Sequence, residues 1–114
     1  MTDNADPILL IYSTFATLEE AKACGQALVE RRLAACVNIL PGMVSVYEWQ
    51  GALDSDEEVV MIIKTRAGIV EETRSALAAI HPYDTPAILT LATEDVNAPY
   101  AGWLREQTMP GAAT

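Results

Sequence analysis

The sequence predicts a single α+β domain in which an antiparallel sheet packs against helices. Its 114 residues fit one domain, which usually spans about 100–200 residues. Apolar residues make up 51% of the chain and charged residues 20%, a composition typical of folded proteins. Apolar spacing alternates between strand-like and helix-like segments along the chain. We therefore treat residues 1–114 as one domain, with residues 1–6 and 109–114 as flexible tails.

An apolar run at residues 8–12 predicts the first strand, and its continuity is typical of a strand covered on both faces. Thr17 and Glu20 then have the spacing of a capping box. In such a box the threonine hydroxyl accepts from the glutamate amide, and the glutamate carboxylate accepts from the threonine amide. Helical spacing follows and ends near Arg31 and Arg32, whose positive charges suit a helix C-terminus.

The second strand is predicted at residues 36–40, Pro41 and Gly42 interrupt it, and a strand pattern resumes at residues 44–49. Proline cannot donate to a sheet and glycine tolerates unusual dihedral angles. The interruption is therefore either a bulge or bend in one long strand, or a short connection between two strands. Residues 51–56 predict an acidic turn, and residues 58–66 a third strand that is apolar on both faces.

A second helix is predicted over residues 70–80, and it ends because the residue before Pro82 is disfavoured in helical geometry. Residues 87–93 predict the fourth strand. Asn97 then resembles an N-cap, with Pro99 in the first turn of a last helix. The order of strands and helices is that of the ferredoxin-like fold, a split βαβ sandwich.

A sheet with helices on one face leaves its other face uncovered. The second and third strands are apolar on both faces, and their hairpin carries Tyr47 and Trp49. An exposed apolar surface of this size makes a monomer prone to aggregate. We therefore expect a homo-oligomer in which another copy of the chain covers this face.

Five short motifs resemble, in order, those of the CutA divalent-cation-tolerance family. They are residues 33–42 (LAACVNILPG), 47–51 (YEWQG), 58–66 (EVVMIIKTR), 81–86 (HPYDTP) and 100–104 (YAGWL). The resemblance covers residues 8 to 108. It implies a ferredoxin-like subunit in a tight homotrimer, with long hairpins that pair between subunits. It also implies a cytoplasmic protein linked to tolerance of copper and other divalent metals.

The resemblance implies a copper site in some members, made of a cysteine near the end of the first strand and two adjacent histidines. In this sequence Ser13 stands in place of the cysteine and Ile80 in place of the first histidine. Only His81 remains as a metal ligand, and a single imidazole is a poor copper site. We predict no firmly bound cofactor, and only weak binding of a divalent metal such as Cu²⁺ at His81.

Seven residues are candidates for lining a ligand cleft between subunits. They are Cys36, Trp49, Glu58, Lys64, His81, Tyr83 and Trp103. Most have a structural alternative. A cationic His81 would favour the carbonyl dipoles of a helix end, or the ring could be a hydrogen-bonded structural side chain. Lys64 could pair with Glu58, six residues earlier on the same face. Trp49 could pack at a subunit interface, and Trp103 in the core.

Two further groups of residues are assigned structural roles. Cys24 and Cys36 are expected to be reduced thiols, because two cysteines at this spacing form neither a zinc motif nor a CxxC pair. The carboxylates of residues 54–58 could collect hard cations weakly. They lack the spacing of a calcium loop, which favours a solvated tip.

The charge balance excludes several classes of partner. Seven basic and sixteen acidic residues give a net charge of −9, which opposes binding to nucleic acid and to anionic membranes. No apolar run reaches the roughly 20 residues needed to span a bilayer. The N-terminus is polar and acidic, unlike a secretory signal, so we expect a cytoplasmic protein.

No motif predicts an enzyme. The sequence has no glycine-rich phosphate loop, no nucleophile elbow and a single histidine to act as a base. The leading hypothesis is a trimeric, non-enzymatic metal-tolerance protein. One alternative is a PII-like signalling trimer that binds a small anion or nucleotide, by fold analogy alone. Another is a structural trimer that supports assembly of a partner protein.

Overall fold

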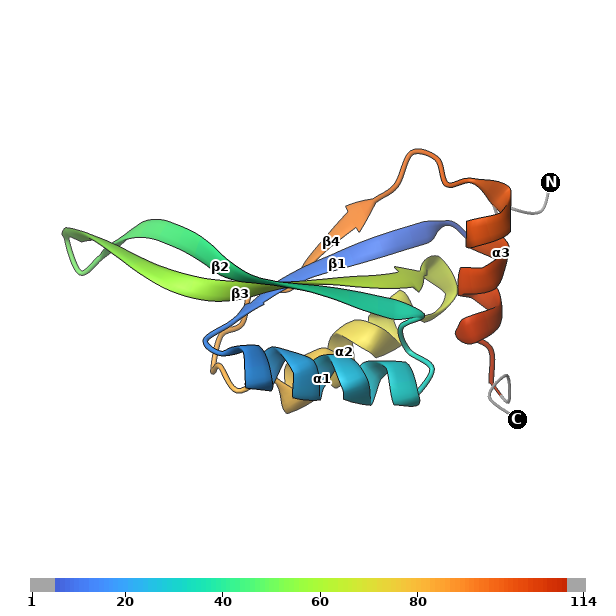
Figure 1. The fold of residues 1–114 in the computed structure, drawn as a ribbon, viewed down its shortest axis with the longest axis horizontal. Coiled ribbons are helices and arrows are strands. Elements are labelled where there is room, and N and C mark those ends of the chain that lie inside the picture. Colours follow the sequence, from blue (N-terminus) through green and yellow to red (C-terminus); the bar gives the residue numbers. More distant parts are fainter. Residues whose placement is uncertain (1–5, 111–114) are drawn as a thin grey trace.

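Four antiparallel strands form one sheet, and two helices cover one of its faces (Figure 1). The computed structural model describes residues 6–110. The strands are β1 (Ile8–Phe15), β2 (Cys36–Trp49), β3 (Ala52–Arg66) and β4 (Leu89–Ala92). The helices are α1 (Leu18–Glu30), the 3-10 turn η2 (Ala67–Ile69), α2 (Val70–Ile80) and α3 (Ala98–Gln107). The sheet order β2-β3-β1-β4 confirms the predicted α+β, split βαβ fold.

The core lies between the sheet and helices α1 and α2. Ile11 and Phe15 of β1 are fully buried there, together with Leu28 of α1 and Leu77 of α2. Helix α1 approaches the sheet closely at Gly25, where an added Cβ would lie 2.7 Å from Cγ2 of Val37. The glycine is therefore required for this packing distance.

Helix α1 begins and ends with hydrogen-bonded caps. The Thr17 hydroxyl accepts from the Glu20 amide at 3.1 Å, which confirms one half of the predicted capping box. Oε1 of Glu20 is buried and has no partner in the described part of the chain, so this oxygen does not supply the other half. At the C-terminus, the amides of Arg32 and Leu33 donate to carbonyls of the last turn at 3.1 and 3.0 Å. Arg32 adopts a left-handed φ of 63°, completing a Schellman motif.

Strands β2 and β3 pair from Cys36 opposite Lys64 to Trp49 opposite Ala52. A register shift between Leu40 and Met43 shows that the Pro41-Gly42 interruption is a bulge in one long strand.

The hairpin turn consists of Gln50 and Gly51 alone, with φ values of 51° and 85°. Positive φ at both positions is typical of a two-residue type I′ turn. The predicted acidic turn at residues 51–56 was therefore wrong, because residues from Ala52 onward belong to β3. Pairing with β2 overrides the low strand propensity of the acidic residues.

Half of this hairpin extends beyond the sheet. Strand β1 pairs with β3 only as far as Phe15 opposite Val59, so residues 43–58 pair only with one another. We call residues 43–58 the projecting hairpin (Figure 1). It gives the molecule a long dimension of 51 Å, against 29 and 22 Å for the other two.

Helix α3 lies at the opposite end of the sheet from the projecting hairpin (Figure 1). Its Ala101 and Leu104 pack on Ile8 and Ala35 in a second, small core. The predicted start of this helix is confirmed, but the Asn97 side chain makes no capping bond. Proline in the first turn lacks an amide hydrogen and so removes one of the donors that a cap would serve.

The opposite sheet face carries apolar side chains that no element of the described chain covers. We call this the open face, and its members alternate with buried core residues such as Ile11. They are Leu10, Tyr12, Leu40, Ile62, Leu89 and Leu91. Of these, Leu40, Leu89 and Leu91 are about half exposed. The fourth strand is shorter than the predicted residues 87–93.

Asp6, predicted within the N-terminal tail, is held in place by the body of the protein. Its carboxylate accepts from Nη1 of Arg66 at 2.8 Å and from the Gly68 amide at 2.7 Å. The same guanidinium donates to the Thr108 carbonyl at 2.9 Å, near the end of the described chain. The remaining residues of the predicted tails include 1–5 and 111–114, which lie outside the described residues.

Candidate functional site

The predicted site residues separate into two clusters along β3, with Trp49 apart from both. Glu58 and Lys64 belong to different clusters, because six strand residues at roughly 3.3 Å each separate them by about 20 Å. The predicted Lys64–Glu58 pair was therefore wrong. Nζ of Lys64 instead donates to the Tyr100 hydroxyl at 3.1 Å and lies 5.3 Å from the centroid of that ring.

The first group, which we call the hairpin-root cluster, consists of Ser45, Glu58, His81 and Tyr83. Both oxygens of Glu58 accept hydrogen bonds, from the Ser45 hydroxyl at 2.8 Å and from the Tyr83 hydroxyl at 2.9 Å. Burial, followed by the bond to Glu58, raises the pKa of Tyr83 to about 12. Tyr83 is therefore a neutral donor near neutral pH, and the Glu58 carboxylate has a fixed orientation.

His81 is buried, and both of its ring nitrogens have backbone partners. Nε2 lies 3.0 Å from the Thr14 carbonyl oxygen, and Nδ1 accepts from the Tyr83 amide at 3.1 Å. A carbonyl can only accept, so Nε2 carries the hydrogen and the ring is the neutral Nε2–H tautomer. The ring also stacks on Phe15 with centroids 4.3 Å apart.

The electrostatic surroundings of His81 agree with a neutral ring. Burial lowers its pKa, against smaller opposing effects of the Thr14 carbonyl and Glu20. The structure thus has the hydrogen-bonded structural histidine rather than the cationic one at a helix end. In this arrangement neither ring nitrogen has a lone pair free for a metal ion.

Ser13 and Ile80 occupy the other two positions of the copper site that the resemblance implies, and neither adds a metal ligand. Ser13 lies fully buried on the core side of β1, and its hydroxyl has no hydrogen-bond partner within residues 6–110. Ile80 ends α2, and its carbonyl accepts a weak bond from the Cys24 thiol at 3.6 Å. Among the described residues, no group of three or more His, Cys, Asp or Glu side chains could hold a metal ion.

The second group, which we call the α3 cluster, consists of Cys36, Lys64, Tyr100 and Trp103. Cys36 is the cross-strand neighbour of Lys64. The Tyr100 ring below the Lys64 ammonium stacks on Trp103 at a centroid distance of 5.6 Å. Trp103 is partly exposed and the Cys36 thiol is half-buried, so both can contact a ligand or a partner.

The two cysteines are free thiols in different environments. Cys24 is buried, and burial, with a smaller effect of Glu20, raises the pKa of its thiol. Cys36 is the more accessible of the two. The two thiols are not joined to each other in a disulfide.

Trp49 lies at the tip of the projecting hairpin, where it is the last residue of β2, is 62% exposed and belongs to neither cluster. Val46 and Leu53 near it are 71% and 82% exposed. The hairpin tip is therefore an apolar surface and not part of either cluster.

Sequence reasoning missed Ser45 as a member of the site. A serine in an alternating strand carries no signal of its own, and its position beside Glu58 depends on the bulge after Leu40. Tyr100 was predicted as a core or cleft-lining residue of the last helix, without a partner. Its role as the partner of Lys64 becomes visible once α3 is placed on the end of the sheet.

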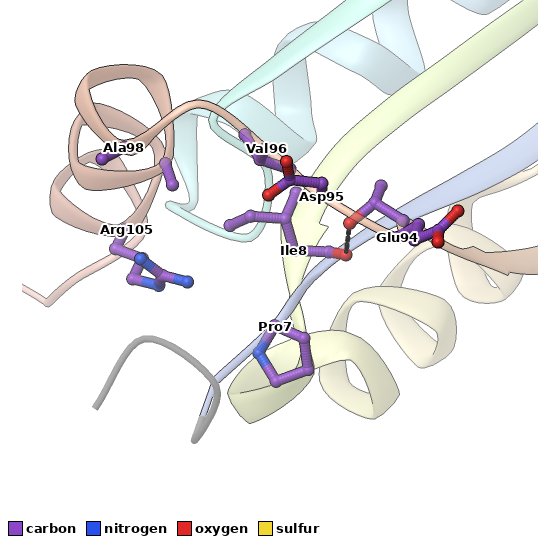
Figure 2. A pocket seen from close by; sticks show the side chains of 9 residues that line it. Pro7, Ile8, Glu94, Asp95, Val96, Ala98 and Arg105 are labelled. Atoms are coloured by element: carbon purple, nitrogen blue, oxygen red, sulfur yellow. Dashed lines mark hydrogen bonds between the residues drawn. The ribbon is translucent and has the colours of Figure 1, made fainter. Parts of the chain in front are cut away.

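Neither of two cavities found among the described residues joins the two clusters. A cavity of about 170 Å³ at the hairpin root is lined by Glu58 but by no other candidate. A second cavity, of about 240 Å³, lies between the start of β1, residues 93–96 and α3, and contains none of the seven candidates (Figure 2). Glu94, Asp95 and Arg105 supply its charged groups.

The comparisons with known proteins agree with this geometry. Residues 9–107 match the family described as CutA1 divalent ion tolerance protein. Divalent-cation tolerance protein CutA of Thermus thermophilus is 40% identical over 87% of this chain and 96% of its own length. The Pyrococcus horikoshii protein of the same name is 38% identical over 89% of this chain and 98% of its own.

A solved structure is similar in fold as well. The crystal structure of divalent ion tolerance protein CutA1 from Ehrlichia chaffeensis has a TM-score of 0.89 and 36% identity, covering 91% of this chain and 97% of that one. The match in sequence and fold extends over nearly all of the described residues. The chain therefore belongs to the CutA1 divalent ion tolerance protein family.

Proposed function

We propose that this chain acts as a non-enzymatic homotrimer that supports tolerance of divalent cations, copper among them. In this proposal a cleft between subunits binds a metal ion or a small ligand. Family membership supports the cation-tolerance role, and none of the relatives named above carries an enzymatic activity in its name. The observation that carries the proposal is the uncovered apolar surface of the single chain.

Two surfaces favour assembly. The open face carries half-exposed leucines, and the projecting hairpin carries exposed Val46, Trp49 and Leu53. Burial of apolar surface is the main favourable term in protein association, at about 25 cal/mol per Å². The hairpin also has backbone edges that β1 and β4 do not pair, which suits strand pairing between subunits.

Assembly also supplies a reason for the two separated clusters. One chain holds Glu58 and Lys64 about 20 Å apart. A neighbouring subunit that placed its α3 cluster near the hairpin-root cluster would bring a cation, aromatic rings and a thiol to face a carboxylate. The cleft of this proposal therefore forms only between subunits.

Light scattering tests the assembly directly. We expect a mass about three times the 12.3 kDa of the chain. A stable monomer at micromolar concentration would contradict the proposal. A thermal-shift panel then distinguishes the ligands, because binding to the native state raises the melting temperature. Stabilisation by Cu(II) or Zn(II) supports a metal cleft. Stabilisation by nucleotides or small carboxylates alone would favour a signalling role instead.

For copper, the predicted ligand His81 would have to release the Tyr83 amide to bind through Nδ1, or the Thr14 carbonyl, with loss of the Nε2 hydrogen, to bind through Nε2. The half-buried Cys36 thiol is a softer donor and needs no such rearrangement. Calorimetric titration of Cu(II) into the native protein, a His81→Gln variant and a Cys36→Ser variant identifies the donor. We expect the cysteine substitution to weaken copper binding more than the histidine substitution.

We propose a cytoplasmic location for the protein. No helix within residues 6–110 has the length and apolar character to cross a bilayer. Matching proteins carry other compartments in their names, chloroplastic for one from Arabidopsis thaliana and periplasmic for one from Archaeoglobus fulgidus. Fractionation of cells that express the full-length protein tests the location.

A further inference from the structure

We propose that Tyr83 is a positioning residue that sets the direction of the projecting hairpin relative to the sheet. It does so by holding Glu58 at the hairpin root through the 2.9 Å bond to its carboxylate. The consequence for assembly rests on the proposed function, because a trimer that uses its hairpins requires them to point in one direction.

The hairpin root is where the sheet loses its support. The last pair between β1 and β3 joins Phe15 and Val59, and Glu58 is the next residue outward. On β2 the bulge between Leu40 and Met43 lies at the same level, with Gly42 at a φ of 85°. A two-stranded hairpin is only marginally stable by itself, and a bulge bends its strand. The direction of residues 43–58 is therefore not fixed by strand pairing with the sheet.

One side of the root is not filled by packing. The cavity of about 170 Å³ lies here, between the start of α1 at Thr17 and Leu18 and the bulge at Pro41 and Gly42. The helix that would otherwise support the hairpin thus leaves space beside it. Any contact that restrains the hairpin must come from elsewhere.

A chain of contacts supplies this restraint from the core. His81 is fixed by its stacking on Phe15 and its bond to the Thr14 carbonyl. His81 in turn accepts from the Tyr83 amide, which fixes the backbone of Tyr83. The Tyr83 hydroxyl then donates to Glu58 on β3, and Ser45 on β2 donates to the other oxygen of the same carboxylate. Glu58 therefore joins both strands of the hairpin to the loop that follows α2.

A second tyrosine provides a matched control. The Tyr47 hydroxyl donates to Asp56 at 2.5 Å, and the pKa of Tyr47 is raised to about 12 mainly by this bond. The chemistry is the same as at Tyr83, but both partners lie inside the projecting hairpin. Tyr47→Phe therefore removes a similar bond without disconnecting the hairpin from the core.

The test measures a distance within one chain by pulsed electron spin resonance. Spin labels are placed at the hairpin tip and on α2, through Ala52→Cys and Glu71→Cys, both at exposed positions. Cys36→Ser removes the accessible native thiol, and Cys24 stays buried. Labelled chains are refolded with an excess of unlabelled chains, so that only the distance within a subunit is read.

We expect one narrow distance for the parent protein and for Tyr47→Phe, and a shifted or broadened distribution for Tyr83→Phe. We also expect Tyr83→Phe to raise the concentration for half-assembly about tenfold, within the range for one lost hydrogen bond to a charged group. An unchanged distribution in Tyr83→Phe, or an equal change in both variants, would overturn the inference. A monomer with the expected distances would contradict the proposed trimer and leave the positioning role of Tyr83 standing.

Discussion

At the residue scale, His81 shows how hydrogen bonding decides what a side chain can do. It is the single histidine of the chain, and the sequence predicted it as a metal ligand or a structural residue. Composition and motif cannot distinguish these two roles, because a histidine before Pro82 is compatible with either of them. The distinction comes from the Thr14 carbonyl and the Tyr83 amide, which lie at positions that only the folded chain defines.

The tautomer of His81 is directly testable. We expect the ¹⁵N spectrum at pH 7 to show one neutral imidazole with its hydrogen on Nε2, with an unambiguous assignment because there is no other histidine. The lowered pKa means that the unfolded chain takes up a proton more readily than the folded one just below pH 6.5. Stability therefore falls as pH decreases from about 6.5 through the folded pKa.

Denaturant unfolding at pH 7.5 and pH 5.0 measures this loss. Carboxylates also contribute in this range, so the comparison uses His81→Gln, whose amide can still donate to the Thr14 carbonyl. We expect the native protein to lose more free energy of unfolding between the two pH values than the variant does. Equal losses would mean that the fold does not disfavour the charged ring.

Arg32 combines a backbone cost with a side-chain gain. Its left-handed φ of 63° is unfavourable for a residue with a Cβ, while its guanidinium donates to the Gln107 carbonyl at 3.0 Å. Arg32→Ala loses the bond and keeps the backbone cost, whereas Arg32→Gly loses the bond but removes that cost. We expect Arg32→Ala to be less stable than Arg32→Gly by about 1 kcal/mol in chemical denaturation. The reverse order would show that the left-handed backbone is not strained.

At the element scale, the spacing of apolar residues predicted those features of strands and helices that depend on neighbouring residues in the sequence. The strand at residues 8–12, the capping-box threonine and the end of α2 before Pro82 all follow from nearby residues. The acidic segment after Gly51 was misassigned because its strand conformation comes from pairing with β2 and not from its own composition. The two clusters could be predicted only in part. Strand geometry alone separates Glu58 from Lys64, but the partners Ser45 and Tyr100 depend on a bulge and on helix docking.

Single substitutions should stabilise or strain the turn of the projecting hairpin. Gln50 has a φ of 51°, where asparagine is favoured, so Gln50→Asn creates the preferred Asn-Gly turn. Gly51 has a φ of 85°, so Gly51→Ala adds strain of about 1 kcal/mol. We expect hydrogen exchange near the tip to slow in the first variant and to accelerate in the second. Equal rates of hydrogen exchange in the two variants would indicate that the turn is not type I′ in solution.

At the scale of the whole molecule, the open face and the projecting hairpin each group exposed apolar side chains, a pattern that marks an interaction surface on a small protein. The core between the sheet and helices α1 and α2 is complete within one chain. We therefore expect each subunit to fold around its own core and to gain further stability from assembly.

The open face is tested by a pair of equivalent substitutions. Leu91 is 48% exposed on the open face, and Val29 is 38% exposed near the end of α1. Leu91→Glu places a charge within the proposed interface and should weaken assembly strongly, because an unpaired buried carboxylate is costly. Val29→Glu adds the same charge on α1, away from the open face and the hairpin root, and should leave the mass in light scattering unchanged. Equal behaviour of the two variants would contradict the use of the open face.

Assembly should also couple stability to concentration. If three chains unfold together, the melting temperature rises with protein concentration, because mass action favours the associated native state. A melting temperature that stays constant over a hundredfold range would show that folding and assembly are independent. The melting temperature of Leu91→Glu should depend less on protein concentration than that of the native protein.

The bonds from Arg66 to Asp6 and to Thr108 bring both ends of the described chain to one side chain. These ends lie away from the hairpin tip, at the other end of the long axis (Figure 1). A circular permutant is therefore feasible, with a short linker that joins Thr108 to Asp6 and with new ends at Gln50 and Gly51. Such a permutant would keep every core contact while cutting the covalent link between the two strands of the hairpin. A fusion partner attached before Asp6 or after Thr108 would, for the same reason, start at the end of the molecule away from the hairpin tip.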